Sequence, residues 1–179
     1  DALLNAIGHG AQLYTFNGAA FDLKLLWSLS GRDEVRQMAL DHCDLLVDFV
    51  CDLRYYASMD SFATATLRGD NTSKSNTGAW AATAWFCGEA ERVLEYCAND
   101  TRVLKLLVEH VAKHGKLQRH TKAGKLATWV LPNLDGTIRP VAVAMKNASA
   151  VPAWLSEPPA LPDISWTATD PFADQIYPH

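Results

Sequence analysis

Two short patterns in the sequence place carboxylates beside residues that could assist them in catalysis. The first is Asn17-(x)3-Phe21-Asp22, and the second is Tyr96-(x)3-Asp100. Carboxylate oxygens are the ligands that Mg²⁺ and Mn²⁺ prefer in proteins. Two inward carboxylates on separate helices therefore predict a shared metal centre, with Asp22 and Asp100 as ligands.

Asp100 falls on the apolar face of a helix expected from about residue 89 to 113. At about 100° per residue, five apolar side chains gather on one arc around it. They are Val93, Cys97, Leu104, Leu107 and Val111. An inward carboxylate is costly unless it is paired or binds a metal, so internal pairing with backbone or arginine stays open. Tyr96, one turn earlier, could orient a metal-bound water or be a core tyrosine.

Asp22 has a similar position in a helix expected over residues 20–30. Leu25, Leu26 and Leu29 follow it at helical spacing, which predicts that Asp22 shares an inward face with them. The helix dipole also favours an acidic residue in the first turn, but that preference does not explain an inward direction.

The elements around the first pattern favour an α/β sheet. Residues 12–16 predict a strand, residues 20–30 a helix that stops at Gly31, and the apolar run 45–50 a second, buried strand. This order is a βαβ unit.

Other segments predict mostly helices, then a hairpin and a tail. Helices are expected over residues 2–8, from 59 to about 69, over 80–86 and over 89–113, with a polar loop over 69–78. Residues 126–131 and 137–144 predict a β-hairpin around the turn 133–136, and the proline-rich tail from residue 151 is expected to be extended or partly disordered.

The motifs, in their order and spacing, resemble those of the DEDDy 3′–5′ exonucleases of the RNase H-like superfamily. Residues 13–23 resemble the second exonuclease motif, and residues 96–100 resemble the third motif in its tyrosine form. This group includes the proofreading domains of family A and B DNA polymerases and RNase D-like enzymes. Residues 58–62, Lys74 and the Gly88-Glu89 pair resemble its phage and bacterial members, so a bacterial or phage-infected cytoplasm is expected.

The resemblance implies an RNase H-like fold and hydrolysis of phosphodiester bonds at single-stranded DNA or RNA 3′ ends. It implies a two-metal site for Mg²⁺ or Mn²⁺, with Asp22 and Asp100 as ligands and Tyr96 positioning the attacking water. Asn17 and Phe21 would shape the substrate pocket, with Phe21 packing against the core rather than stacking on a base. A polymerase or another replication protein is a possible partner.

One part of the family pattern is missing. The first motif, Asp-x-Glu, occurs nowhere in the chain. We therefore expect an incomplete domain that lacks its opening strands, with the exonuclease-like portion over residues 1–131, the hairpin extension over 132–150 and the tail over 151–179. Asp41, Asp44, Asp48 and Asp60 are weak candidates to replace the absent ligands. The alternative is a catalytically incomplete RNase H-like module that binds nucleic acid or protein, or a structural domain whose aspartates pair internally.

Composition excludes some classes of protein. The chain has 179 residues, 49% of them hydrophobic, and a formal charge of −4, which argues against a protein that coats polyanions. No apolar run approaches the roughly 20 residues needed to span a bilayer. The cysteines lack CxxC spacing and are expected to be buried free thiols. They are Cys43, Cys51, Cys87 and Cys97.

Three further features have ordinary explanations. His110 and His114 have a zinc-compatible spacing, but the sequence offers no obvious further ligand, so a solvated helix face is favoured. Trp80 and Trp85 are expected in the core. A basic stretch after the long helix could contact phosphates or be a solvated loop. Its members are Lys113, Lys116, Arg119, His120, Lys122 and Lys125.

Overall fold

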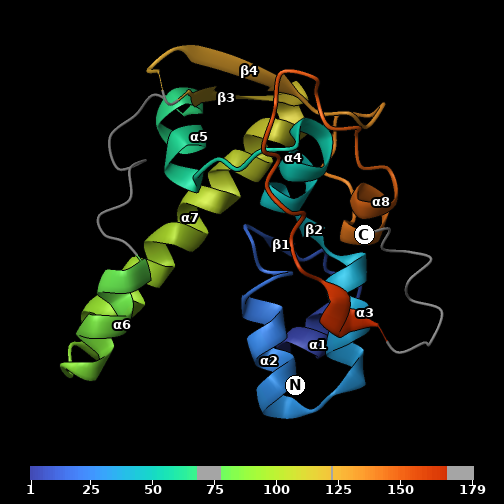
Figure 1. Ribbon diagram of the computed structural model, residues 1–179. Helices are drawn as coiled ribbons and strands as arrows, with labels where there is room; N and C mark the ends of the chain where they lie inside the picture. Colours follow the sequence, from blue (N-terminus) through green and yellow to red (C-terminus); the bar gives the residue numbers. More distant parts are fainter. Residues whose placement is uncertain (68–77, 122, 169–179) are drawn as a thin grey trace. The chain divides into compact units, whose positions relative to one another are not determined.

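The computed structural model describes residues 1–67, 78–121 and 123–168, and the expected polar loop lies almost entirely outside them. The chain divides into two compact units (Figure 1). Unit 1 comprises residues 1–56 and 138–179, and unit 2 comprises residues 57–137. The described elements are helices and short strands, a mixed α/β architecture compatible with the expected RNase H-like fold.

Unit 1 contains a βαβ unit, as predicted, although its second strand is not the predicted one. Strand β1 (Tyr14–Thr15) pairs in parallel with β2 (Cys43–Asp44), and the crossover between them carries α2 (Asp22–Ser30) and α3 (Asp33–Asp41). Helix α2 ends at Gly31, whose φ of 64° is left-handed and suits glycine. A short helix, α1 (Ala2–Gly8), precedes β1 as predicted.

The apolar run predicted as a second strand is instead helix α4 (Leu45–Leu53). The strand lies just before it, at β2. Residues 45–51 of this run are all buried, and a short buried run of this kind cannot be assigned to a strand or a helix from its pattern alone. Asp44 decides between them, because its carboxylate accepts hydrogen bonds from the amides of Leu46 and Val47 and caps the helix.

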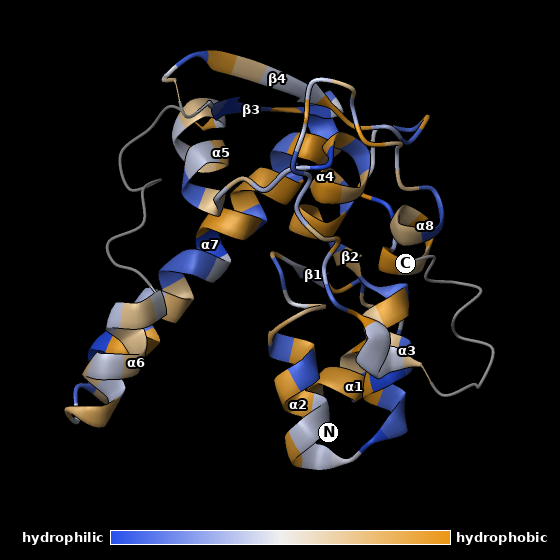
Figure 2. Ribbon diagram, in the orientation of Figure 1, coloured by the Kyte–Doolittle hydropathy of each residue, from blue (hydrophilic) through white to orange (hydrophobic). Residues whose placement is uncertain are grey.

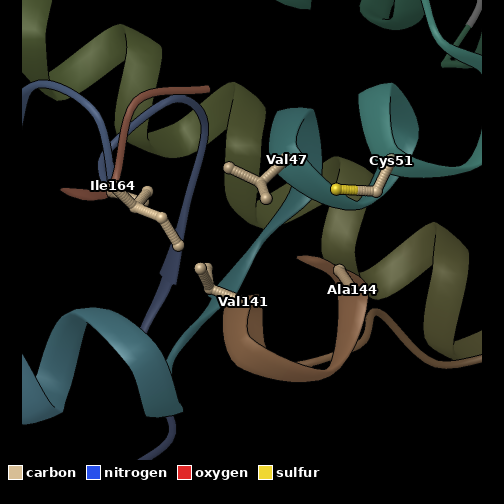
Figure 3. Packing of buried hydrophobic residues seen from close by; sticks show 6 residues of the cluster. Val47, Cys51, Val141, Ala144 and Ile164 are labelled. Carbon is tan, nitrogen blue, oxygen red and sulfur yellow. The ribbon is translucent and has the colours of Figure 1, made fainter. Parts of the chain in front are cut away.

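The core of unit 1 joins distant parts of the chain. Figure 3 shows Val47 and Cys51 of α4, Val141 and Ala144 of α8 (Val141–Lys146), and Ile164 of the tail gathered in one cluster. The tail is therefore not simply extended, since residues 164–167 pack into unit 1 and include a 3-10 turn, η1 (Ser165–Thr167). Residues 169–179 lie outside the described part.

Unit 2 is built on the predicted long helix. Helix α7 (Ala90–His114) ends at Gly115, and α5 (Met59–Thr66) and α6 (Gly78–Phe86) precede it, close to their predicted positions. The side-chain hydroxyl of Ser58 caps α5 by accepting from the amide of Ser61 at 3.1 Å.

The predicted hairpin around residues 133–136 is wrong, because its first strand pairs instead with an earlier segment. Strand β3 (Lys116–His120) pairs antiparallel with β4 (Leu126–Val130). The expected second strand over residues 137–144 does not form. Pro140 has no amide for a ladder; it makes one isolated bridge with Cys43 and then starts α8.

Two of the four thiols are buried as expected and two are not. Cys43 and Cys51 lie in unit 1, where burial raises their pKa values to about 11 and about 12. Cys87 and Cys97 are exposed, so their predicted burial is wrong. Cys97 lies at the edge of the apolar arc of α7, where the helix face turns to solvent.

Candidate functional site

The first motif begins with a tight loop after β1. Asn17 has a φ of 69°, a left-handed conformation that asparagine tolerates better than most residues. Gly18 follows and packs directly on Thr15, because a Cβ at Gly18 would lie 2.6 Å from the Thr15 Cβ. The Asn-Gly pair is therefore required by this turn and its close approach.

A buried carboxylate holds this loop. Asp44 is fully buried and accepts hydrogen bonds from the amides of Asn17 and Ala19, at 2.9 and 3.0 Å, and from the Thr15 hydroxyl at 2.8 Å. Burial alone would raise the pKa of Asp44, but its hydrogen bonds outweigh burial and hold that pKa below 3.8.

The network extends from Asp44 to a buried histidine. The Thr15 hydroxyl lies 2.9 Å from Nε2 of His42, whose Nδ1 faces the Ala39 carbonyl at 2.9 Å. Nε2 of His42 is 3.9 Å from the nearer Asp44 oxygen, so Thr15 bridges the two groups.

Asp22 is the first residue of α2, at the end of this loop. It is exposed, and Leu25, Leu26 and Leu29 are exposed with it, so the predicted inward face is wrong for unit 1. Leu23 is the buried residue of this helix. The four exposed positions form an apolar face with a carboxylate in it, part of which appears as orange bands on α2 in Figure 2.

The pKa of the Asp22 carboxyl is raised although the residue is exposed. Partial loss of hydration, helped by the negative charge of Asp44, raises the pKa of Asp22 above 3.8, and a backbone hydrogen bond opposes the rise.

The two proposed substrate residues differ in exposure. Asn17 is half-buried, and its carbonyl accepts from the Phe21 amide at 3.1 Å. Phe21 is 64% exposed, so its predicted packing against the core is wrong. An exposed aromatic ring next to Asp22 is free to contact a ligand face.

The second motif lies on the buried stripe of α7, as predicted. Tyr96 is buried and Asp100, one turn later, is half-buried. The stripe continues through Val93, Val103, Leu107 and Val111. The ring of Tyr96 packs edge-on against Trp80 of α6, with centroids 5.9 Å apart. The helix period thus sets the direction of both residues.

The motifs belong to different units. Asn17, Phe21 and Asp22 are in unit 1, and Tyr96 and Asp100 are in unit 2. That the two carboxylates share one cleft stays a prediction. Among residues 1–67, 78–121 and 123–168, no group of three or more His, Cys, Asp or Glu side chains could hold a metal ion.

The sequence analysis did not predict the structural roles of two buried aspartates, Asp44 at the N-cap of α4 and Asp48 within α4. Asp44 holds the loop of the first motif, and Asp48 pairs with Arg139, whose Nε lies 2.6 Å from its carboxylate and whose amide lies 2.9 Å away. Neither serves as a substitute metal ligand, because hydrogen-bond donors already surround both. The Asp before an apolar run was the available signal for a helix cap.

The remaining candidates give no second site. The His110 and His114 rings stack at 4.3 Å on α7, and burial, then the neighbouring cations, lowers the pKa of His110. Trp80 is half-buried, whereas Trp85 is 55% exposed, so its predicted core position is wrong. The basic stretch is largely strand β3 and its turn rather than a loop, and Lys122 lies outside the described residues.

A pocket of about 440 Å³ lies between α1 and α3 in unit 1. Its floor is apolar and its rim carries Arg32, Glu34, Gln37 and Asp41. Among the described residues, none of the five candidate site residues lines this pocket; they are Asn17, Phe21, Asp22, Tyr96 and Asp100.

Comparison with known proteins identifies the family. A model of the RNase H superfamily matches residues 1–112, and the chain belongs to this superfamily. No curated protein and no solved structure matches the chain. The match spans both motifs and indicates a nuclease-like function on nucleic acid. In the described part of the chain, no helix has the length and apolarity needed to cross a membrane.

Proposed function

We propose that this chain is part of a DEDDy-type 3′–5′ exonuclease that acts on single-stranded nucleic acid. Asp22 and Asp100 bind the metal ions, Tyr96 positions the attacking water, and Asn17 and Phe21 contact the terminal nucleotide. The proposal goes beyond superfamily membership, which supports a nuclease-like role but not a subtype.

One observation carries the proposal. Asp100 is the sole carboxylate on the buried stripe of α7, because Glu91, Glu95 and Glu109 are all exposed. It lies one turn from a buried tyrosine on the same face, at the spacing of the third motif.

The donor chemistry fits Mg²⁺ or Mn²⁺. Asp22 offers an accessible carboxylate with a raised pKa, and Asp100 offers a half-buried one. When bound, the metal ions would supply an activated water and stabilise the leaving 3′ oxygen. Tyr96 would orient that water through its hydroxyl, while its packing against Trp80 fixes the ring.

The site needs further carboxylates. Asp22 and Asp100 would be half of a four-carboxylate centre, and the Asp-x-Glu pair that completes it is absent from this sequence. Activity is therefore to be measured on the protein expressed from its complete reading frame.

The test is the release of mononucleotides from 5′-labelled single strands with Mg²⁺ or Mn²⁺. We expect shortening from the 3′ end, and no cleavage of a circular single strand, which offers no end. Cleavage of the circle would instead indicate an endonuclease. Binding of either strand without cleavage would favour the alternative, a non-catalytic RNase H-like binding module.

The matched variants are Asp100→Asn and Glu95→Gln on the same helix. Replacing a residue that only supports a metal ligand typically lowers metal affinity or activity by about 10- to 100-fold. Replacing a ligand itself should lower activity by at least that factor. The rate of nucleotide release by the Asp100→Asn variant should therefore fall by at least two orders of magnitude. The exposed Glu95→Gln variant should release nucleotides at the wild-type rate. Unchanged activity in Asp100→Asn would rule the mechanism out.

A further inference from the structure

Asp44 is connected to the first motif more extensively than a helix cap needs to be. Its Oδ1 accepts from the amides of Asn17, Leu46 and Val47, at 2.9, 3.0 and 3.1 Å. Its Oδ2 accepts from the amide of Ala19 and the hydroxyl of Thr15. One carboxylate therefore ties the loop after β1 to the first turn of α4.

The amides that Asp44 binds flank the residue that makes the turn. Asn17 and Ala19 lie on either side of Gly18, and their amides point at opposite oxygens of the same carboxylate. The next two hydrogen bonds start α2: the amide of Phe21 donates to the carbonyl of Asn17, and that of Leu23 to the carbonyl of Gly18. The path from Asp44 to the start of α2, where Asp22 lies, is thus a continuous set of hydrogen bonds.

Ala19 is fixed on all sides. Its side chain is fully buried in the cluster of α4 and α8, its amide binds Asp44, and its carbonyl accepts from Nε1 of Trp166 at 3.0 Å. Because Ala19 is held through its side chain, amide and carbonyl, the two residues that connect it to Asp22 restrict where the Asp22 carboxylate can lie.

Asp44 affects Asp22 through this hydrogen-bonded path. Asp44 itself has its oxygens occupied by donors and is not available as a ligand.

We propose that Asp44 is a positioning residue, which fixes the Asn17–Ala19 loop and thereby sets the place and cation affinity of Asp22. Thr15 supports it through its hydroxyl, which also links it to His42. This inference rests on the proposed function only in taking Asp22 as a metal ligand.

The direct test measures Mn²⁺ binding to the full-length protein, by the loss of the free-ion electron paramagnetic resonance signal. Removal of groups that orient metal ligands weakens binding by about 10- to 100-fold, and we expect that range for Asp44→Asn. The control is Asp48→Asn, which also removes a buried charge of α4 but has its hydrogen bonds with Arg139 rather than the loop. It should keep the wild-type Mn²⁺ affinity.

A second readout needs no metal. In Asp44→Asn, hydrogen exchange at the amides of Asn17 and Ala19 should accelerate more than at the amides of α8. Thr15→Val should show the same pattern more weakly, and Thr15→Ser, which keeps the hydroxyl, should restore both slow exchange and Mn²⁺ affinity.

The outcomes separate the two claims. If wild-type protein binds Mn²⁺ and Asp22→Asn does not reduce the binding, the metal role of Asp22 fails, and the positioning role fails with it. If Asp22→Asn abolishes binding but Asp44→Asn binds like wild type, only the positioning role is overturned. An equal loss of affinity in Asp44→Asn and Asp48→Asn would also overturn it, because general destabilisation would then explain the effect.

Discussion

In the first motif, Asn17 and Ala19 bind a carboxylate 27 and 25 residues further along the chain, and Asp22 follows from their placement. In the second motif, Tyr96 and Asp100 share one face of α7 because a helix repeats every 3.6 residues. The first arrangement depends on tertiary contacts that close unit 1. The second is determined by local structure, so its geometry should tolerate changes that disrupt the first.

The largest expected effect is that of Asp48→Ala in unit 1. The change leaves the guanidinium of Arg139 buried without its partner, which typically costs about 3–5 kcal/mol. Urea unfolding followed by hydrogen exchange should show a greater loss of protection in α4 and α8 than in α7. The double variant Asp48→Leu/Arg139→Met should recover most of the loss. Equal losses in both units would contradict the comparison.

Gly18→Ala should be the next most damaging change. The added methyl group would lie 2.6–2.7 Å from the Thr15 side chain, and overpacking of this kind typically costs about 1–3 kcal/mol. We expect a lower unfolding free energy and faster exchange at the Ala19 amide. An unchanged free energy would mean that the loop relaxes easily and is not held by Asp44.

Ala98→Gly is the counterpart in the second motif. Ala98 is an exposed residue of α7 between Tyr96 and Asp100, so the change should cost about 1 kcal/mol through helix propensity alone. The unfolding free energy of unit 2 measures this cost. A loss as large as that of Gly18→Ala would show that the second motif also depends on more than its helix.

The smallest expected effects concern the acid response of unit 1, where the pKa shifts of two buried aspartates have opposite signs. The folded-state pKa of Asp44 is below 3.8, so its stabilisation is complete above that pH and is lost as the pH falls through the lower value. Burial, which outweighs the attraction of Arg139, raises the pKa of Asp48, so its contribution is lost as the pH rises above 3.8.

Replacing either aspartate should reveal the other shift. Asp44→Asn should flatten the acid loss of stability, and Asp48→Asn should steepen it, in urea unfolding followed from about pH 7 to pH 2. Changes of slope in the same direction would contradict the assigned signs.

The same contrast explains what could be predicted from the sequence. Helix α7 and the inward position of Asp100 follow from a period sustained over 25 residues. Residues 45–51 after Asp44 are all buried, and so short a run cannot be assigned to a strand or a helix from its pattern alone, so the helix cap was the better signal. The role of Asp44 toward Asn17 and Ala19 could not be predicted, since it binds backbone amides, which every residue type except proline provides.

The prediction that Asp22 faces inward was wrong for a related reason. Periodicity grouped it correctly with Leu25 and Leu29, but it could not tell which face of α2 packs on α3. Leu23 is the buried residue of α2, and the face that carries Leu25 and Leu29 is exposed. Exposure and carboxylate position both depend on tertiary contacts, which a local pattern does not specify.

The central claim is that Asp22 and Asp100 hold the same metal centre. The most direct measurement is a crystal structure of the full-length protein soaked in Mn²⁺, with the ions located by anomalous scattering. The account predicts manganese bound by both carboxylates, in a pair of ions about 4 Å apart, with the Tyr96 hydroxyl at the edge of the site. Manganese at only one of these aspartates, or carboxylates too far apart to share the pair, would contradict it.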